Sequence, residues 1–388
     1  MNVYLDNSAT TKLDERVFEK MKPFMRDEYG NASAIHSMGQ RNHLVLIKAK
    51  EDIAKILHCD KDNIIFTAGA TESNNMIIKG VMVGNRKKGK HILVSSIEHP
   101  SVLKPAEQLK AEGFDVELIP VNSAGIVDLE KIKKMVRPDT ILISVMAVNN
   151  EIGTIQPVEK IGAFAKKNGI LFHVDAVQAV PYLNIDIKKW NADFLSLSAH
   201  KFYGPKGIGL AYINRKVNVH PVIAGGGQEY GLRGGTYNIP GIVGMVEALK
   251  LAYAERDSYI RKVTELKNHL WGRIQKEIDD VYINGDTINR TPNNLNLRIE
   301  RIEGEAILMD LSVKGVYVST GSACSAENLR ASGVLKAIGL KGELLNSNIR
   351  MTLGRFNTKE EMDYTVDCLK DTVKRLRSFT PITKAYGA

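Results

Sequence analysis

Short apolar runs alternate with stretches of helical periodicity from about residue 60 to residue 215. This alternation is typical of βαβ units that build a mainly parallel sheet. The predicted strands are Asn63–Thr67, His91–Ser96, Val116–Pro120, Thr140–Ala147, Ile170–Val174, Phe194–Leu197 and Gly209–Ile213. Helical stretches such as Glu72–Val83 and Val158–Lys167 lie between them. We therefore expect an α/β fold around a mainly parallel, seven-stranded sheet.

The C-terminal third has a different pattern. A Gly-rich run, Ala224–Gly241, precedes a helical pattern that continues from about Gly241 to Ile278. Because this pattern exceeds the usual length of a helix, we expect it to be kinked or to bridge two domains. Short strands are predicted near Asn294–Ile299 and Gly315–Ser319, followed by a final amphipathic helix. The apolar stripe of that helix comprises Met362, Val366, Leu369, Val373 and Leu376.

The length of the chain, 388 residues, favours two domains, since a single core rarely grows beyond about 250–300 residues. We place a large domain at 15–250. A smaller α+β domain is expected to combine residues 1–14 with residues 251–388.

Composition narrows the class of protein. The chain is 44% hydrophobic and 25% charged, which is ordinary for a soluble globular protein. It has no apolar run of about 18 residues, so we expect no membrane span, and its first residues do not resemble a secretion signal. Its three cysteines contain no C-x-x-C pair, which argues against a disulfide framework or a zinc site. We therefore expect a cytoplasmic protein.

The net charge of +9 has two interpretations. It favours either an acidic partner or a general bias of the surface toward basic residues. The densest basic run, Asn85–His91, lies between a predicted helix and a predicted strand, where a solvated turn is the simpler explanation. With no nucleic-acid motif in support, we expect no direct contact with nucleic acid.

Polar residues follow the predicted strands, and ligands of open parallel sheets bind beyond the carboxyl ends of the strands. After the first strand, a glycine turn leads to Thr71 at the start of a helix, where free N–H groups suit a phosphate. Simple N-capping by Thr71 is the alternative. The later strands are followed by His99, Asn149, Asn150, Asp175, Gln178, Ser198, His200 and Lys201.

Each of these residues has an ordinary structural explanation when taken alone, but five strand ends in succession indicate one site. The set matches the needs of pyridoxal phosphate (PLP). That cofactor requires a lysine for a Schiff base, an acid beside the pyridine nitrogen and a cradle for its phosphate. Lys201, in the run "SAHK", is the best lysine for this role.

The sequence resembles the cysteine desulfurases of the NifS/IscS type, within the fold-type I PLP enzymes, and the resemblance extends over nearly the whole chain. The motifs that carry it include "YLDNSATT" (Tyr4–Thr11), "GATESNN" (Gly69–Asn75), "EHPSVL" (Glu98–Leu103), "NNEIGTIQP" (Asn149–Pro157), "HVDAVQ" (His173–Gln178), "SAHKFYGPKGIG" (Ser198–Gly209), "GGGQEYGLRGGT" (Gly225–Thr236), "STGSACS" (Ser319–Ser325) and "IRMTLGRFNT" (Ile349–Thr358).

The resemblance implies a role for each matching residue. Lys201 would bind PLP covalently, Asp175 would pair with the pyridine nitrogen, and Gln178 would contact the ring hydroxyl. His99 would stack on the ring and move protons. Asn150 and Arg350 would bind the substrate carboxylate, which suits the forked guanidinium. The residues expected to hold the phosphate are Ala70, Thr71, Ser198, His200 and, from the neighbouring subunit of a homodimer, Thr236.

The resemblance also implies the reaction, in which L-cysteine becomes L-alanine and its sulfur passes to Cys324 as a persulfide. The attacking group must be a thiolate. Cys324 lies in a Gly/Ser/Ala-rich segment at about 319–333, which has little side-chain burial to lose and which we expect to move. The expected acceptors are iron–sulfur scaffold proteins or thiolation partners. Cys324 could also ligate a cluster iron transiently, together with such a scaffold. Cys59 and Cys368 are expected to be structural.

Other functions remain open at this stage. An aminotransferase or another fold-type I lyase would explain Lys201, Asp175 and Arg350 but not the Cys324 segment. A selenocysteine lyase is also an alternative, since the sequence does not distinguish selenocysteine from cysteine as the preferred substrate. An inactive PLP-fold scaffold protein is disfavoured because both the lysine and the aspartate are present.

Overall fold

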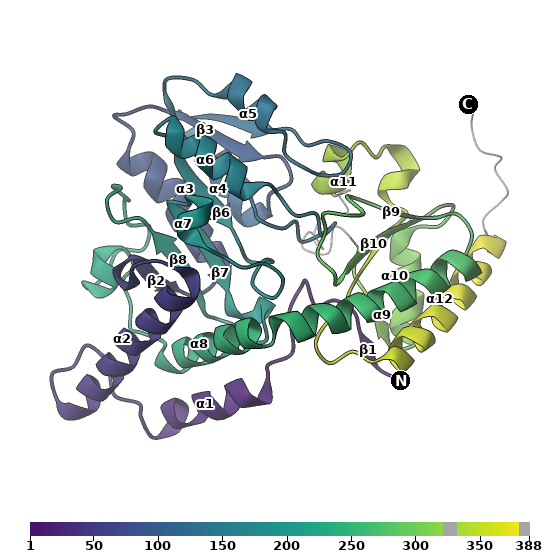
Figure 1. Cartoon of the computed structure of the whole chain (residues 1–388), viewed down its shortest axis with the longest axis horizontal. Coiled ribbons are helices and arrows are strands. Elements are labelled where there is room, and N and C mark those ends of the chain that lie inside the picture. The colour runs from purple at the N-terminus through teal and green to yellow at the C-terminus, as the bar shows by residue number, and fades with distance from the viewer. Residues whose placement is uncertain (321–331, 380–388) are drawn as a thin grey trace.

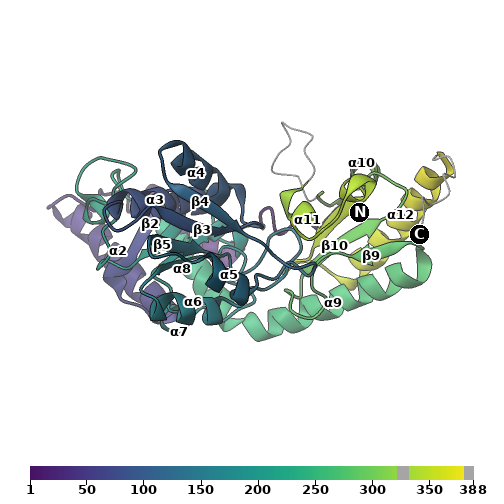
Figure 2. The same cartoon turned by 90° about the horizontal axis from the view of Figure 1, so that it is seen from above.

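The computed structural model describes residues 1–320 and 332–379, and its largest part is built on a seven-stranded sheet (Figures 1 and 2). The strand order is β2-β8-β7-β6-β5-β3-β4. The strands are β2 (Ile64–Thr67), β3 (His91–Ser95), β4 (Asp115–Ile119), β5 (Thr140–Ser144), β6 (Leu171–Asp175), β7 (Phe194–Ser198) and β8 (Gly209–Ile213). Only β8 runs antiparallel to its neighbours in this sheet, β2 and β7. The expectation of a mainly parallel, seven-stranded sheet is confirmed.

Helices cover both faces of this sheet. The helices whose buried residues pack on one face are α3 (Ala70–Gly84) and α4 (Pro100–Ala111). Those that pack on the other face are α1 (Glu15–Arg26), α2 (Ser37–Leu57), α5 (Leu129–Met135), α6 (Val158–Lys167), α7 (Ile187–Trp190) and α8 (Ile239–Ala254). Both faces are therefore removed from water, and all strands except the edge strand β4 are buried along nearly their whole length.

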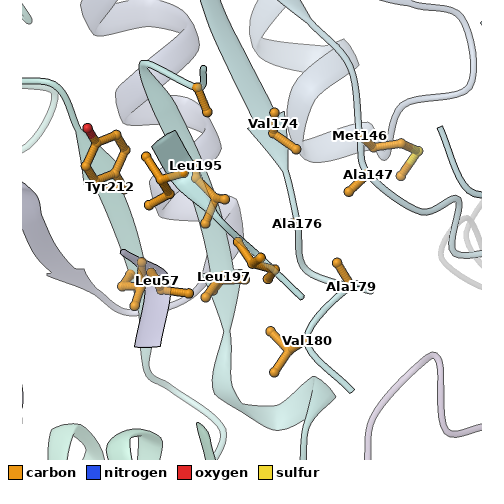
Figure 3. Packing of buried hydrophobic residues seen from close by; sticks show 14 of the residues in the cluster. Leu57, Met146, Ala147, Val174, Ala176, Ala179, Val180, Leu195, Leu197 and Tyr212 are labelled. Atoms are coloured by element: carbon orange, nitrogen blue, oxygen red, sulfur yellow. The ribbon is translucent and has the colours of Figure 1, made fainter. Parts of the chain in front are cut away.

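Successive side chains of one strand enter different cores. In β7, Phe194 joins the core beneath α3 and α4, whereas Leu195 and Leu197 join the larger core on the opposite face. Figure 3 shows Leu195 and Leu197 among residues of that larger core, with Val174 and Tyr212 from neighbouring strands close by. The sheet is thus packed on both faces, and it supports the loops at its edge.

The long helical pattern after the Gly-rich run forms two helices. Helix α8 ends at Ala254, and α9 (Arg256–Glu277) begins after Glu255. The side chain of Glu255 pairs with Arg16 and with Arg355, so the break lies at a junction of three chain segments. Figure 2 shows α9 extending from the seven-stranded sheet to the C-terminal part of the molecule. The expected kink is present at Glu255.

The C-terminal part has its own small sheets and core. Its elements are β9 (Val281–Ile283), β10 (Asn294–Ile299), α10 (Gly304–Val313), β11 (Val316–Tyr317), α11 (Gly333–Ala337), β12 (Asn348–Thr352) and α12 (Lys359–Phe379). Strands β12, β10 and β9 form one sheet, and β11 pairs with the N-terminal strand β1 (Val3–Tyr4). The division into domains at 15–250 stays a prediction.

Two local expectations need correction. Strand β5 ends at Ser144, three residues before the predicted end, because its pairing with β3 stops there, although the amides of Val145 and Ala147 still donate to carbonyls of β6. Helix α3 begins at Ala70, and its N-cap is Gly69 rather than Thr71. Thr71 therefore lies inside the first turn, and capping does not account for it.

Over residues 1–320 and 332–379, no helix is both long enough and apolar enough to cross a membrane. Cys59 and Cys368 are free thiols that pack against the two cores, as expected of structural cysteines.

Candidate active site

A cavity of about 940 Å³ lies where the carboxyl ends of the central strands meet the N-terminal segment and β12. Most of the residues predicted for the site line this cavity. They are Ala70, Thr71, His99, Asn150, Asp175, Gln178, Ser198, His200, Lys201 and Arg350. The fold therefore brings together side chains that are up to 280 positions apart in the sequence, from Ala70 to Arg350.

One end of the cavity is suited to an anion. Helix α3 starts there, and its N-cap residue, Gly69, has no side chain with which to cap the first amides. Strand β8 passes directly behind this turn, because a Cβ on Gly209 would lie only 2.7 Å from the Cα atom of Gly69. Ser198 ends β7 beside the same turn, and a Cβ on Gly69 would lie 3.7 Å from its Oγ.

Asp175 is a nearly buried carboxylate at the end of β6. Its Oδ1 accepts a hydrogen bond from the Val177 amide at 3.0 Å, and its Oδ2 accepts one from Asn74 Nδ2 at 2.9 Å. Both oxygens therefore have a fixed donor, which orients the carboxylate. Gln178, on the same turn, donates from Nε2 to the Ser8 carbonyl at 2.9 Å.

Lys201 ends a short 3-10 helix, Ala199–Lys201, that follows β7 directly. Its Nζ donates to the carbonyl of Ser8 at 2.5 Å and to that of Ala9 at 2.8 Å. The "YLDNSATT" motif thus supplies backbone acceptors that hold the amine within the cavity. The carboxylate Asp175 lines the same cavity from the neighbouring strand.

His99 caps helix α4 with its ring. Its Nδ1 accepts the Ser101 amide at 3.1 Å and lies 2.8 Å from Ser101 Oγ. Burial lowers the pKa of His99, and the Lys201 charge lowers it further, whereas Asp175 acts in the opposite direction. The ring is therefore predominantly neutral near pH 7. Burial likewise lowers the pKa of His200 to about 4, with help from Lys201 and Lys206.

Arg350 enters the cavity from β12 and is only 3% exposed. Its Nη2 pairs with Asp6 Oδ1 at 2.7 Å, and its Nη1 donates to the Asn150 carbonyl at 3.1 Å. Among the described residues, Arg350 Nε has no hydrogen-bond partner. A buried guanidinium held on two sides in this way is suited to a carboxylate ligand.

Two of the predicted residues are not part of this lining. Thr236 is exposed on the Gly-rich loop and does not line the cavity of its own chain. Cys324 lies outside the described residues, so its roles as nucleophile and as iron ligand stay predictions.

Several residues of the site were not predicted from the sequence. Asp6 holds Arg350, and Asn74 and Ser101 link Asp175 to His99. Each belongs to a motif quoted above, but a motif does not reveal partners that are separated by 101 or 344 positions. Glu98, which directly precedes His99, was not predicted either. Burial, together with the Asp175 charge, raises the pKa of the Glu98 carboxyl well above its usual value.

The arrangement fits PLP. The uncapped start of α3 suits the phosphate, and the oriented Asp175 suits the pyridine nitrogen. Lys201 places a primary amine in the same cavity, where it would hold the aldehyde carbon. The roles of the individual residues remain predictions.

Comparison with known proteins gives a consistent result. The class-V aminotransferase family matches residues 3–365. "Cysteine desulfurase IscS" of Dictyoglomus turgidum is 48% identical over 384 residues, which cover 99% of this chain and 98% of that protein. "Cysteine desulfurase IscS" of Methanosarcina thermophila is 45% identical, covering 98% of this chain and 94% of that protein.

Solved structures agree with the sequence relatives. A structure described as "NIFS-LIKE PROTEIN" superposes with a TM-score of 0.92 at 40% identity, covering 97% of this chain and all of that chain. A structure described as "SspA in complex with cysteine" has a TM-score of 0.81 at 36% identity, covering 92% of this chain and all of that chain.

Proposed function

The chain belongs to the class-V aminotransferase family and, within it, to the cysteine desulfurases, and on this premise we propose how its residues carry out the reaction. It is a PLP-dependent enzyme that converts L-cysteine to L-alanine and takes up the sulfur. The observation that best supports the proposal is the single cavity lined by Lys201, Asp175 and Arg350 together with the start of α3. An aminotransferase or a selenocysteine lyase is not favoured by relatives named cysteine desulfurase.

The cofactor would be held at three points. Ala70 and Thr71 at the start of α3, with Ser198 and His200, would hold the phosphate. Asp175 would pair with the pyridine nitrogen, Gln178 would contact the ring hydroxyl, and Lys201 Nζ would bind PLP covalently. When bound, PLP supplies an electron sink for the pair released at the substrate α-carbon.

The substrate carboxylate would be bound by Arg350 and Asn150, which line the same cavity. The Asp6 carboxylate and the Asn150 carbonyl hold the Arg350 guanidinium in place, so it need not reorganise when a carboxylate arrives. Lys201 Nζ would take the α-proton of the substrate. His99 is neutral, lines the same cavity and would donate a proton from Nε2.

The substrate sulfur would be transferred to the thiolate of Cys324. The carbon–sulfur bond of L-cysteine breaks, a sulfur–sulfur bond forms with the Cys324 thiolate, and the carbon keeps the bonding pair and is protonated to give L-alanine. Atoms and electrons balance without a further oxidant or reductant. Cys59 is a poor substitute for Cys324, because burial raises the pKa of its thiol to about 12.

A homodimer and a protein acceptor complete the proposal. Thr236 is exposed in its own chain, and Val222 and Ile223 are 42% and 40% exposed where they line the cavity. These residues would meet a second copy, whose cavity Thr236 would complete. The sulfur would then pass to an iron–sulfur scaffold protein or a thiolation partner in the cytoplasm, where thiols stay reduced.

Borohydride reduction tests the assignment of Lys201. We expect mass spectrometry to find reduced PLP on Lys201 in the wild-type protein. A matched control is Lys206→Ala, because Lys206 lines the same cavity and its removal should leave the adduct in place. An adduct on Lys206, or labelling that survives in Lys201→Ala, would contradict the proposal.

A further inference from the structure

A hydrogen-bonded chain behind the cavity connects Asp175 to His99. Asn74 lies on α3, fully buried, and its Nδ2 group donates to Asp175 Oδ2 at 2.9 Å and to Ser101 Oγ at 2.8 Å. Ser101 Oγ lies 2.8 Å from His99 Nδ1. Three elements that are far apart in the sequence, α3, α4 and the end of β6, are joined by this chain.

The direction of each hydrogen bond follows from the chemistry of the groups. A carboxylate oxygen accepts, so the group of Asn74 that faces Asp175 is its NH₂ rather than its carbonyl. The second proton of that NH₂ is directed to Ser101 Oγ. Ser101 has one hydroxyl proton, and His99 Nδ1 is the neighbour that can accept it.

A backbone hydrogen bond also indicates that Nδ1 of His99 is the unprotonated nitrogen. The Ser101 amide donates to His99 Nδ1 at 3.1 Å, and an amide N–H cannot act as an acceptor. Nδ1 is therefore unprotonated, and the proton of the neutral ring is on Nε2. Because Nδ1 is occupied at the start of α4, Nε2 is the nitrogen left for the cavity that His99 lines.

We propose that Asn74 is a positioning residue that orients the Asp175 carboxylate and, through Ser101, fixes His99 in the tautomer with its proton on Nε2. His99 then enters the reaction as a donor at Nε2, and Lys201 is the group that accepts a proton first. The roles of Asp175 and His99 toward PLP rest on the proposed function, whereas the tautomer of His99 does not.

The tautomer is measured directly by nitrogen NMR of histidine-labelled holoenzyme, with His99 assigned by its absence in His99→Gln. We expect the His99 Nδ1 resonance in the range of an unprotonated nitrogen and Nε2 in the range of a protonated one. In Asn74→Leu, Ser101 Oγ has lost the donor that directs its own proton to Nδ1, so Nδ1 keeps only the weaker of its two donors, the Ser101 amide, and the two resonances should move toward each other. A wild-type ring protonated on Nδ1, or Asn74→Leu spectra identical to wild type, would overturn the proposal.

Ser101→Ala is the matched control. It removes the hydroxyl that links Asn74 to His99 but keeps the Ser101 amide. In the Ser101→Ala background, Asn74→Leu should no longer change the His99 resonances. A change of the same size as in the wild-type background would show that Asn74 does not act through Ser101. Asn74→Ser replaces the amide with a smaller group and serves if the leucine variant does not fold.

Kinetics supply a second readout. Asn74 does not line the cavity, so its loss should leave KM for L-cysteine within about twofold and lower kcat about tenfold. Loss of an acid–base group itself would cost about 10²–10⁴-fold. Equal kcat in Asn74→Leu and wild type would count against a positioning role. If wild-type protein fails to desulfurate cysteine, the proposed function fails, while the tautomer experiment still stands or falls on its own.

Discussion

Glu151 is a carboxyl group that the fold holds beside Arg350. It follows Asn150 in the sequence, and Ser332 Oγ donates to its Oε2 at 2.5 Å. Burial raises the pKa of Glu151 to about 7, while Ser332 and the Arg350 charge lower it. Its protonation therefore changes near neutral pH, close to the residue expected to bind the substrate carboxylate.

Substitution of Glu151 by glutamine should make stability less dependent on pH. The folded state keeps the Glu151 proton up to about pH 7, whereas the unfolded chain loses it above about pH 4.5. Charging the half-buried carboxyl thus destabilises the wild type as pH rises through this window. Relative to wild type, Glu151→Gln should gain about 2 kcal/mol in unfolding free energy between pH 5 and pH 8.

Urea unfolding of both proteins at the two pH values measures this difference. Groups that titrate in both proteins cancel in the comparison, so the change isolates Glu151. A gain that is the same at pH 5 and pH 8 would mean that Glu151 titrates in its ordinary range.

At the residue scale, the side chains that line the cavity could be predicted from the sequence, whereas their hydrogen-bond and ion-pair partners could not. Lys201, Asp175 and His99 follow apolar strands, and that position alone places them at the ligand-binding edge. Asp6 and Asn74 could not be found in this way, because they act on the site only by binding Arg350 and Asp175, which are distant in the sequence. Distance in the sequence hides such pairs from any local pattern.

Strand β8 illustrates how an element can shape the site without contributing a side chain. Gly209, its first residue, pairs with Thr67 of β2 and Ser198 of β7. A Cβ at this position would lie 2.6 Å from the Leu197 carbonyl oxygen and 2.7 Å from Gly69 Cα. The close approach of β8 therefore requires glycine and supports the turn that opens α3.

Gly209→Ala should consequently affect both stability and cofactor binding. The added methyl must push against backbone atoms, which costs about 1–3 kcal/mol and displaces the turn at Gly69. We expect a lower urea midpoint and faster loss of PLP on dialysis.

Gly272→Ala in α9 is the matched control. Within the described part of the chain, an added methyl at Gly272 would meet no atom within 4 Å beyond the backbone of its own helix. Alanine should therefore stabilise the helix by about 0.5–1 kcal/mol. If the two variants behave alike, close packing at Gly209 is not the cause.

Elements were predictable where burial leaves a clear pattern. All strands of the large sheet except the edge strand β4 are buried along nearly their whole length. Six of the seven predictions deviate by at most one residue at either end, with only β5 further off. The break between α8 and α9 was expected only as a kink, because no proline or glycine marks Glu255. At the break, Glu255 pairs with Arg16 and Arg355, and a local sequence pattern does not contain such distant partners.

At the scale of the whole molecule, the cavity is formed by distant parts of one chain and, we propose, completed by another. Light scattering should give a mass of about 86 kDa, twice the 43.0 kDa of the chain. Thr236→Val should weaken PLP retention without changing that mass, since it removes a hydroxyl and keeps the shape. A wild-type mass of 43.0 kDa would refute the dimer. Equal PLP retention in Thr236→Val and wild type would refute the shared site.

The destination of the substrate sulfur tests the central claim most directly. Wild-type holoenzyme is mixed with L-cysteine in the absence of reductant, and alanine and protein-bound sulfur are measured together by mass spectrometry. We expect one added sulfur on the peptide containing Cys324 for each alanine formed in the first turnover. Cys324→Ser should lose both products, whereas Cys59→Ser and Cys368→Ser should retain them. Alanine formed without sulfur on Cys324, or sulfur found on Cys59 or Cys368 instead, would contradict the mechanism.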